Sequence, residues 1–507
     1  MRHIFLKLTA LTLALLFCLS LALPAVLAED AEPETFQCGA YDYTLLDDGT
    51  AKIIRYYSNG PNLIIPETLD GHPVTGLGDM TFSFQILSSF PIPGLEGPGV
   101  CESLQSVTLP DSLLFLEGNP FRSCENLSAF VVSPDHPVFA VLDGALIDKT
   151  TQTLLCYPPG KEETIFSVPE GVEKIGEEAF FCCDKLTDVI LPDSVAIIGR
   201  MAFANCKGLT GLAIPDSVVT IEADAFYLCE SLAGVSFADG NVKMENNPFT
   251  RCPKLAAFSV SPDHLTLCVI DGALIDKASN TLICYPPGKE ETDFSVPQGV
   301  KKIGDEAFFC CARLTDVILP DGVTAIGAWA FQYCSGLIRV SLPGSITEIG
   351  ACAFASCMGL KEIALPDGLE VLGDHAFDYC TGLTEITLPA SVRVFGEDVF
   401  SLCYRLTRVS ISDGASSIGD GAFRLCVRLT DVSIPDSVES IGRGAFVGCE
   451  ALTSLSIPDS VTLIGENAFY GCDSLTVNVG RNSCAERYCI DNGIKYTYFD
   501  SLEERGP

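Results

Sequence analysis

The stretch Ile198–Thr220 reads IGRMAFANCKGLTGLAIPDSVVT and is one copy of a 23-residue repeat. Its phenylalanine returns every 23 residues in two long runs, formed by Phe180, Phe203, Phe226 and Phe249 and by Phe308, Phe331, Phe354, Phe377, Phe400, Phe423, Phe446 and Phe469. A fixed period in the twenties is typical of a solenoid, because a single coil of this length cannot bury its apolar residues alone. The period therefore predicts a stacked array of coils.

The segment Leu186–Leu191 has the alternation of a short β-strand. Alternation places Val189 and Leu191 inward and Asp188 and Ile190 on the opposite face. The proline that follows ends the strand, because proline has no amide hydrogen for the ladder.

The rest of the period turns the chain back to the next strand. Val195 and Ile198 are expected in the core, and Gly199 offers a permissive backbone at a corner. Ala202 and Phe203 are expected to pack as a short helical or 3₁₀ segment. We therefore predict an α/β-type repeat solenoid with a parallel β-sheet on the concave face and short helical or 3₁₀ segments on the convex face.

Two intervals between phenylalanines, from Phe121 and from Phe249, are longer, and their extra residues match each other. The motif DGALIDK at Asp143–Lys149 recurs at Asp271–Lys277, and CYPPGKEET recurs with the same offset. An Asp-Gly turn between apolar runs predicts a β-hairpin. We expect two inserted β-hairpins that project from the coils.

The chain divides into four regions. Residues 1–28 have a charged start, an apolar run and an alanine junction, which predict a secretory signal peptide. Residues 29–76 are expected to form an N-terminal hairpin cap and the first coil. Residues 77–480 form the solenoid, with longer units near 121–179 and 249–307, and a proline-rich loop is expected around residues 90–94. Residues 481–507 form a cap helix and a tail, with a capping box at Ser483 and Glu486 and a stop signal at Gly493.

The composition excludes several classes of function. The formal net charge of −35 disfavours nucleic acids and anionic membranes as partners. The sequence contains no nucleophile elbow, phosphate-binding loop or dinucleotide fingerprint, so we expect neither an enzyme nor a cofactor. His136 and His264 lie in Ser-Pro-Asp-His turns. Carboxylates recurring at the Pro-Asp-Ser turn are expected to cap it, and a cation held by stacked carboxylates is the alternative, at Asp111, Asp193, Asp216, Asp436 and Asp459.

Fourteen cysteines share one phase of the repeat, from Cys101 to Cys472. Equivalent side chains in adjacent coils point the same way, whereas a disulfide needs converging Cβ vectors. We therefore expect a ladder of reduced, buried thiols and no zinc site. The redox states of Cys182, Cys310, Cys484 and Cys489 stay open.

One side chain per strand, between the leucine and the valine, is expected on the concave surface. After the second insert these positions carry a ladder of charges, followed two residues later by small side chains that leave the charges unshielded. A solvated, self-paired ladder and a recognition stripe are both consistent with this pattern. The candidate binding residues are Arg339, Glu362, Glu385, Arg408 and Asp431.

The period I-G-x-x-A-F-x-x-C-x-x-L-x-x-V-x-I-P-x-S-V resembles the BspA-type leucine-rich repeats of bacterial surface proteins, over nearly all of the chain after residue 28. The resemblance implies a curved leucine-rich-repeat array, export, and adhesion to an extracellular protein of a host or of neighbouring bacteria. A structural spacer or surface-layer component without a specific ligand is the alternative. We expect a secreted protein without membrane insertion or a covalent anchor. Its retention at the cell surface and its oligomeric state stay open.

Overall fold

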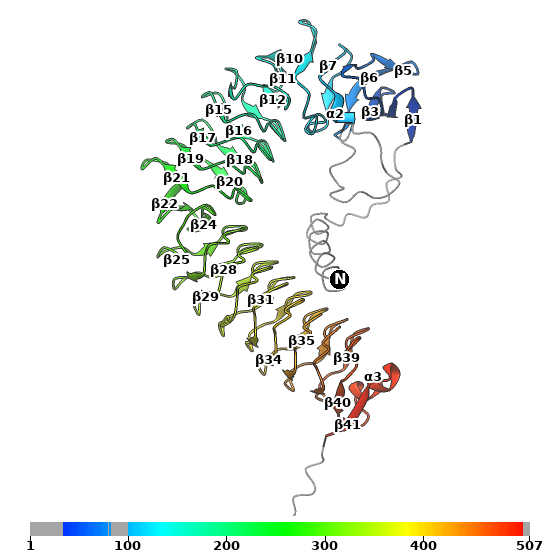
Figure 1. Cartoon of the computed structure of the whole chain (residues 1–507), viewed down its shortest axis with the longest axis vertical. Coiled ribbons are helices and arrows are strands. Elements are labelled where there is room, and N and C mark those ends of the chain that lie inside the picture. Colours follow the sequence, from blue (N-terminus) through cyan, green and yellow to red (C-terminus); the bar gives the residue numbers. More distant parts are fainter. Residues whose placement is uncertain (1–33, 80, 83–99, 500–507) are drawn as a thin grey trace, which may run out of the picture.

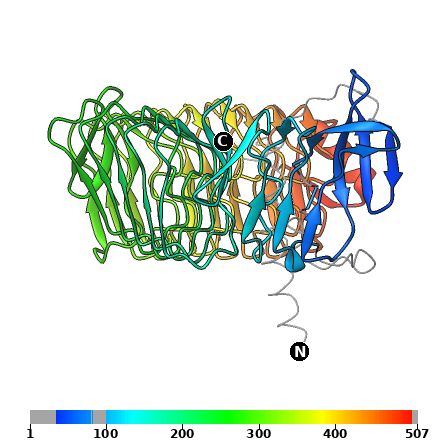
Figure 2. The same ribbon diagram turned by 90° about the horizontal axis from the view of Figure 1, so that it is seen from above.

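The computed structural model of the protein describes residues 34–79, 81–82 and 100–499. These residues form a solenoid that curves through an arc, with the N-terminal strands at one end and helix α3 (Cys484–Asn492) at the other (Figure 1). Seen from above, the coils stack as a slab of nearly constant depth (Figure 2). The expected signal peptide at residues 1–28 and the expected loop at residues 90–94 lie outside the described residues.

Each coil contributes to two rows of parallel strands. The row that we call the long-strand ladder has strands of three or four residues: β4 (Asn62–Ile64), β7 (Ser106–Thr108), β9 (Ala129–Val131), β13 (Ile165–Ser167), β15 (Asp188–Ile190), β17 (Gly211–Ile214), β19 (Gly234–Phe237), β21 (Ala257–Val260), β25 (Asp293–Ser295), β27 (Asp316–Ile318), β29 (Arg339–Ser341), β32 (Glu385–Leu388), β34 (Arg408–Ile411), β36 (Asp431–Ser433), β38 (Ser454–Ser456) and β40 (Thr476–Val479).

The second row, the short-strand ladder, has strands of two residues: β8 (Phe115–Leu116), β14 (Lys174–Ile175), β16 (Ile197–Ile198), β18 (Thr220–Ile221), β20 (Lys243–Met244), β26 (Lys302–Ile303), β28 (Ala325–Ile326), β30 (Glu348–Ile349), β31 (Val371–Leu372), β33 (Val394–Phe395), β35 (Ser417–Ile418), β37 (Ser440–Ile441) and β39 (Leu463–Ile464). The expected solenoid of parallel strands is therefore confirmed.

The expected alternation within each long strand is also confirmed. In the coil of β15, Val189 and Leu191 are buried, whereas Asp188 and Ile190 are exposed. Partners are equivalent residues one coil apart, as in the pairing of Gly211 with Gly234. The repeat period thus sets the register directly.

The expected helical or 3₁₀ segments are not present, because turns occupy their place in the described coils. Met201 and Asn205 have positive φ angles of 51° and 60°, and left-handed residues cannot continue a right-handed helix. Between these residues, successive backbone amides donate alternately to a carbonyl oxygen of the next coil and to one of the same turn. Phe203 N donates to Ala225 O of the next coil at 2.8 Å, and Ala204 N donates locally to Met201 O at 2.9 Å. The turns therefore form a third row of hydrogen bonds between coils.

The expected position of the main sheet on the concave face is wrong. In Figure 1 the long strands, such as β17, β19, β29 and β34, lie toward the outer side of the arc, and the short strands β16, β18, β31 and β35 lie toward its inner side. A sheet lies on the concave side of such an array when the opposite side carries a wider element, such as a helix. Here turns replace the helices, and their phenylalanine rings stack 4.6–5.7 Å apart, close to the strand spacing of about 4.8 Å.

The glycine at the corner of the repeat serves close packing, and the expectation of a permissive backbone is wrong. Gly199 does not have a positive φ angle. A Cβ atom there would lie 2.8 Å from the carbonyl oxygen of Ile175 and 3.0 Å from the amide nitrogen of Glu177 in the preceding coil. Only glycine allows the two coils to approach so closely.

Different elements cover the two ends of the array. At the N-terminus an antiparallel sheet of β1 (Thr35–Cys38), β2 (Tyr41–Leu45) and β3 (Ala51–Tyr56) joins β6 (His72–Leu77), which also pairs with β5 (Thr68–Leu69). The short helix α2 (Val100–Ser103) precedes β7. At the C-terminus β41 (Lys495–Tyr498) pairs in parallel with β40.

Helix α3 begins and ends at the residues that the sequence pattern predicts. The Ser483 hydroxyl accepts a hydrogen bond from Glu486 N at 3.1 Å, and Gly493 takes the left-handed conformation at the C-cap. Ala485 and Cys489 face the last coil and are buried.

The two inserts are three-stranded antiparallel meanders. They contain β10 (Phe139–Leu142), β11 (Ala145–Asp148) and β12 (Thr153–Cys156), and β22 (Leu267–Ile270), β23 (Ala273–Asp276) and β24 (Thr281–Cys284). Asp143 and Gly144 have positive φ angles, which a type I′ turn requires. The third strand of each meander pairs in parallel with the short-strand ladder, as β12 does with β14.

The inserts do not project from the array as expected, because their middle strands, β11 and β23, are buried on both faces. Leu146 packs in the core of the N-terminal coils, whereas its neighbour Ile147 packs in the core of the coils that follow. In the second insert, Leu274 likewise packs in the core of the coils before it and Ile275 in the core of the coils after it. The inserts are therefore internal walls that separate the described core into three clusters.

Candidate functional site

The five candidate binding residues lie at one position of consecutive coils on the exposed face of the long-strand ladder. The backbone of Arg339 forms an isolated parallel β-bridge with that of Glu362 in the next coil. Arg408 is the β-sheet partner of Glu385 on one side and of Asp431 on the other. The structure therefore brings the five side chains into one row. Strands β29 and β34, which carry Arg339 and Arg408, lie toward the outer side of the arc (Figure 1), and Glu362, Glu385 and Asp431 occupy the same position in coils next to theirs. The predicted place of this row on the concave face is therefore wrong.

Each of the two arginines forms an ion pair with the aspartate in the coil on its side away from Glu362 and Glu385. Arg339 Nε lies 3.0 Å from Asp316 Oδ1, and Arg408 Nε lies 3.0 Å from Asp431 Oδ2. Glu362 and Glu385, which occupy neighbouring coils between these pairs, have no ion pair among the described residues. Two adjacent carboxylates are thus left facing solvent, which is unfavourable in the free protein.

The row is interrupted at Glu362. The segment after it forms a single bridge with Arg339 and no strand, so the long-strand ladder is broken between β29 and β32. A hollow of about 480 Å³ lies over this break, between the coils of Arg339 and Glu385. Its lining includes the small side chains of Ser341, Ala364 and Thr387. The small residues two positions after the charged ones therefore form the floor of the hollow. They also leave the charged side chains unshielded, as the sequence predicts.

The cysteine ladder is a structural feature of the core. Ten of the ladder thiols donate to the carbonyl oxygen of a phenylalanine in the preceding coil, at 2.9–3.4 Å, as Cys206 does to Phe180. Cys183 and Cys311, which follow the inserts, donate instead to the carbonyl oxygens of Tyr157 and Tyr285, at 3.6 Å. Burial raises the pKa of the Cys426 thiol to about 12. Because the thiolate is the reactive form, this raised pKa makes the Cys426 thiol unreactive.

One described cysteine of the ladder departs from the expected reduced state. Cys124 is disulfide-bonded, whereas Cys183 and the later ladder cysteines are free. The coil before Cys124 is irregular and contains helix α2, so its side chains need not follow the common direction of the ladder. Cys182, Cys310, Cys484 and Cys489, whose states the sequence left open, are free thiols.

The two turn histidines stabilise the start of each insert. His136 is buried, and its Nδ1 accepts hydrogen bonds from Val138 N and Phe139 N at 3.1 and 3.0 Å. His264 Nδ1 does the same for Thr266 N and Leu267 N. Over the described ranges, no three His, Cys, Asp or Glu side chains form a candidate metal site. No helix in the part of the chain that the structure describes has the length and apolar character to span a bilayer.

A half-buried glutamate follows each insert, and the two glutamates differ in their partners. Glu178 lies 2.8 Å from Arg122 Nη1, which also pairs with Asp79. Glu306 occupies the equivalent place after the second insert, where Thr250 replaces the arginine. Burial, with Asp224 and Asp305 nearby, raises the pKa of Glu306 to about 8.

We expect Glu306→Gln to stabilise the protein more at alkaline than at acid pH. The unfolded pKa of glutamate is about 4.3, so between that value and about 8 the folded state holds the additional proton. The stability that Glu306 contributes is therefore present at low pH and is lost as the pH rises through this range. Glutamine stays neutral throughout. Melting temperatures of both proteins at about pH 5 and about pH 9 measure the difference.

Glu178→Gln is the matched control for this prediction. Burial raises the pKa of Glu178 as well, but the Arg122 guanidinium beside it opposes this effect, so the gain in stability at alkaline pH should be smaller in Glu178→Gln than in Glu306→Gln. An effect of Glu306→Gln that does not change with pH would contradict the assignment of Glu306 as the titrating group.

The match to known families is extensive. The BspA type Leucine rich repeat region matches residues 99–137, 161–268, 288–407 and 395–485, which together are more than half of the chain. None of the curated proteins matches the chain.

Several solved structures are similar to this chain. A leucine-rich cell surface protein from Faecalibacterium prausnitzii shares 28% identity over 76% of this chain and 96% of that one, with a TM-score of 0.49. A leucine-rich repeat protein from Bacteroides ovatus shares 21% identity over 92% and 100% of the two chains, with a TM-score of 0.43. The pneumococcal vaccine antigen PcpA shares 18% identity over 92% and 99%, with a TM-score of 0.41.

The 23-residue period, the two ladders of parallel strands and the extent of the family match lead to one conclusion. The chain belongs to the family of BspA-type leucine-rich-repeat proteins.

Proposed function

We propose that this protein is a non-enzymatic, extracellular protein-binding solenoid that acts as an adhesin or a surface interaction protein. The observation that carries the proposal is the pair of unpaired carboxylates, Glu362 and Glu385, at the hollow in the long-strand ladder. The apolar run at residues 8–23 and the family membership support a place outside the cell.

The chemistry of the hollow favours a partner that presents a lysine or an arginine. A cationic side chain between Glu362 and Glu385 would relieve their repulsion and gain charge-assisted hydrogen bonds. The neighbouring arginines do not compete for these carboxylates, because each is held by its aspartate. The rigid stack of coils fixes the row in advance, which lowers the entropic cost of binding.

Capture of partners by the purified protein from host matrix and bacterial surface proteins tests this proposal. Glu362→Lys combined with Glu385→Lys should abolish capture of the partner, because the variant places cations where the partner's cation would bind. Neither substitution breaks an ion pair within the described residues, so the array should stay folded.

Asp188→Lys combined with Glu450→Lys is the matched control. It makes the same change in net charge at exposed positions of other coils, and it should leave capture unchanged. Equal loss in both variants would show that overall charge, and not the hollow, determines binding. If no protein is captured, the chain acts instead as a structural spacer.

A further inference from the structure

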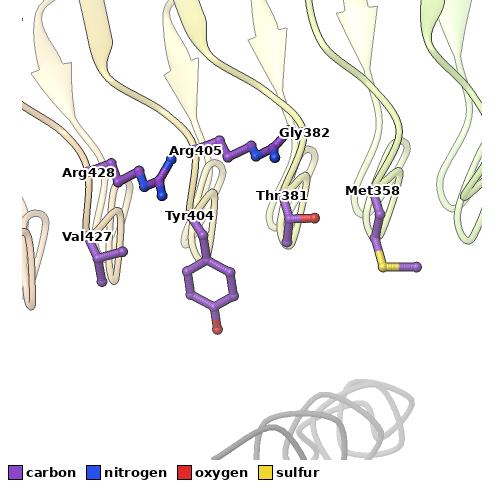
Figure 3. A pocket seen from close by; sticks show the side chains of 7 residues that line it. All are labelled: Met358, Thr381, Gly382, Tyr404, Arg405, Val427 and Arg428. Carbon is purple, nitrogen blue, oxygen red and sulfur yellow. The ribbon is translucent and has the colours of Figure 1, made fainter. Parts of the chain in front are cut away.

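A second hollow, of about 470 Å³, lies where the turns of four consecutive coils meet the long strands. Two rows of side chains line it in Figure 3. One row contains Met358, Thr381, Tyr404 and Val427, which follow the ladder cysteines directly. The other row contains Arg405 and Arg428, each one residue further along the chain.

A glycine occupies the second row one coil before the two arginines. Gly382 occupies the place of Arg405 one coil earlier, and a Cβ atom on it would lie 2.6 Å from the carbonyl oxygen of Met358. Figure 3 shows the guanidinium of Arg405 extending toward Gly382, and that of Arg428 extending toward the coil of Arg405. The glycine therefore serves close packing of the two coils, and the Arg405 side chain extends toward a coil that has no side chain at this position.

The two arginines have no acidic partner within the described residues. Lys185 pairs with Glu162 of the preceding coil at 2.5 Å and Lys207 with Asp184 at 3.5 Å, whereas Lys254 and Arg313, at the same place after their ladder cysteines as Arg405 and Arg428, also form no ion pair among the described residues. Arg405 and Arg428 are exposed, and neither forms an ion pair within the described residues. Two neighbouring guanidinium groups without ion pairs attract an anion locally, against the repulsion from the chain's net charge of −35.

The first row adds an aromatic surface and a hydroxyl group. The ring of Tyr404 packs edge-on against Tyr379 at 6.0 Å between centroids, which holds it in place. Thr381 presents its hydroxyl one coil away, and both side chains point to the same side of the ribbon (Figure 3). A ligand here would meet guanidinium donors along one edge and an aromatic ring along the other.

We propose that this hollow binds an acidic sugar, with its carboxylate or sulfate between Arg405 and Arg428 and its ring on Tyr404. The volume lies within the range of small-ligand sites, about 300–1,000 Å³. An acidic peptide fits less well, because the nearby strand β34 is already paired on both sides and offers no edge for an added strand. Guanidinium groups bind carboxylate and sulfate in the same forked geometry.

Calorimetric titration of the full chain tests the proposal with four probes. Sialyllactose supplies a carboxylate, a chondroitin sulfate disaccharide supplies a sulfate, lactose is the neutral control, and a hexaglutamate peptide represents the acidic peptide. At least one acidic sugar should bind, and lactose should not. Which of the two sugars binds distinguishes the carboxylate from the sulfate.

Arg405→Gln combined with Arg428→Gln should weaken binding of that sugar by about tenfold or more, because two charge-assisted contacts are lost. Tyr404→Ala should weaken it as well. Arg313→Gln is the matched control, because Arg313 has the same place after a ladder cysteine, is exposed, and has a glycine in the next coil. Melting temperatures should not change in the arginine variants. Tighter binding of the peptide, no binding of either sugar, or full affinity in the double variant would overturn the proposal.

Discussion

Phe354→Ala should lower the free energy of unfolding of its part of the array by about 3–5 kcal/mol. Phe354 is completely buried, and its ring stacks nearly parallel on Phe331 and Phe377, at 5.0 and 5.1 Å between centroids. Alanine leaves a cavity in the middle of this stack. Both neighbouring rings lose contacts, because the backbone hydrogen bonds between coils prevent the gap from closing.

The damage should spread along the array by nearest neighbours. In a solenoid each coil contacts only the coils beside it, so hydrogen exchange should rise first around residue 354 and last near the two ends. Tyr470→Ala is the control, because Tyr470 follows the repeat phenylalanine of its coil but is 72% exposed. Uniform loosening from end to end would show that the array unfolds as a single unit.

Leu146→Ala and Ile147→Ala should each cost about 2–5 kcal/mol, but in different blocks of the chain. Both side chains are buried in β11, on opposite faces of the first wall. Leu146→Ala should therefore loosen the coils before the wall, and Ile147→Ala the coils after it. Hydrogen exchange measured separately on the two sides distinguishes these outcomes.

Ile190→Ala provides the control for these two variants. Ile190 lies on a long strand but is 52% exposed, so its truncation should have little effect on stability. If Leu146→Ala and Ile147→Ala loosened the same coils to the same extent, the inserts could not be walls between separate cores.

The two hollows show how far a site can be predicted from a repeat. The row of Arg339, Glu362 and Glu385 follows from strand periodicity, because one position per coil must face solvent. The ionic partner of each arginine cannot be predicted from this periodicity, because each arginine has a carboxylate in the coil on either side. Only the side-chain geometry decides which carboxylate it pairs with. The row of Arg405 and Arg428 was missed, although two basic residues 23 positions apart after a glycine are visible in the sequence.

The inserts were predicted as projecting β-hairpins and not as internal walls. The Asp-Gly pair determines a tight turn through its positive φ angles, which is a local property. Burial on both faces is a tertiary property. The continuous apolar run at Thr153–Tyr157 was its available signal, because strands buried on both faces lack alternation.

The sequence by itself determined the properties that one period contains: the solenoid, the inward residues of each strand, the phenylalanine and cysteine rows, and the cap at Ser483. These depend on spacing and on local backbone chemistry, which every coil repeats. Only the tertiary structure decided the side of the arc on which the long strands lie, the disulfide at Cys124, the buried walls and the two hollows. These depend on how each coil is placed against the next, and that placement results from small differences in packing summed over many coils.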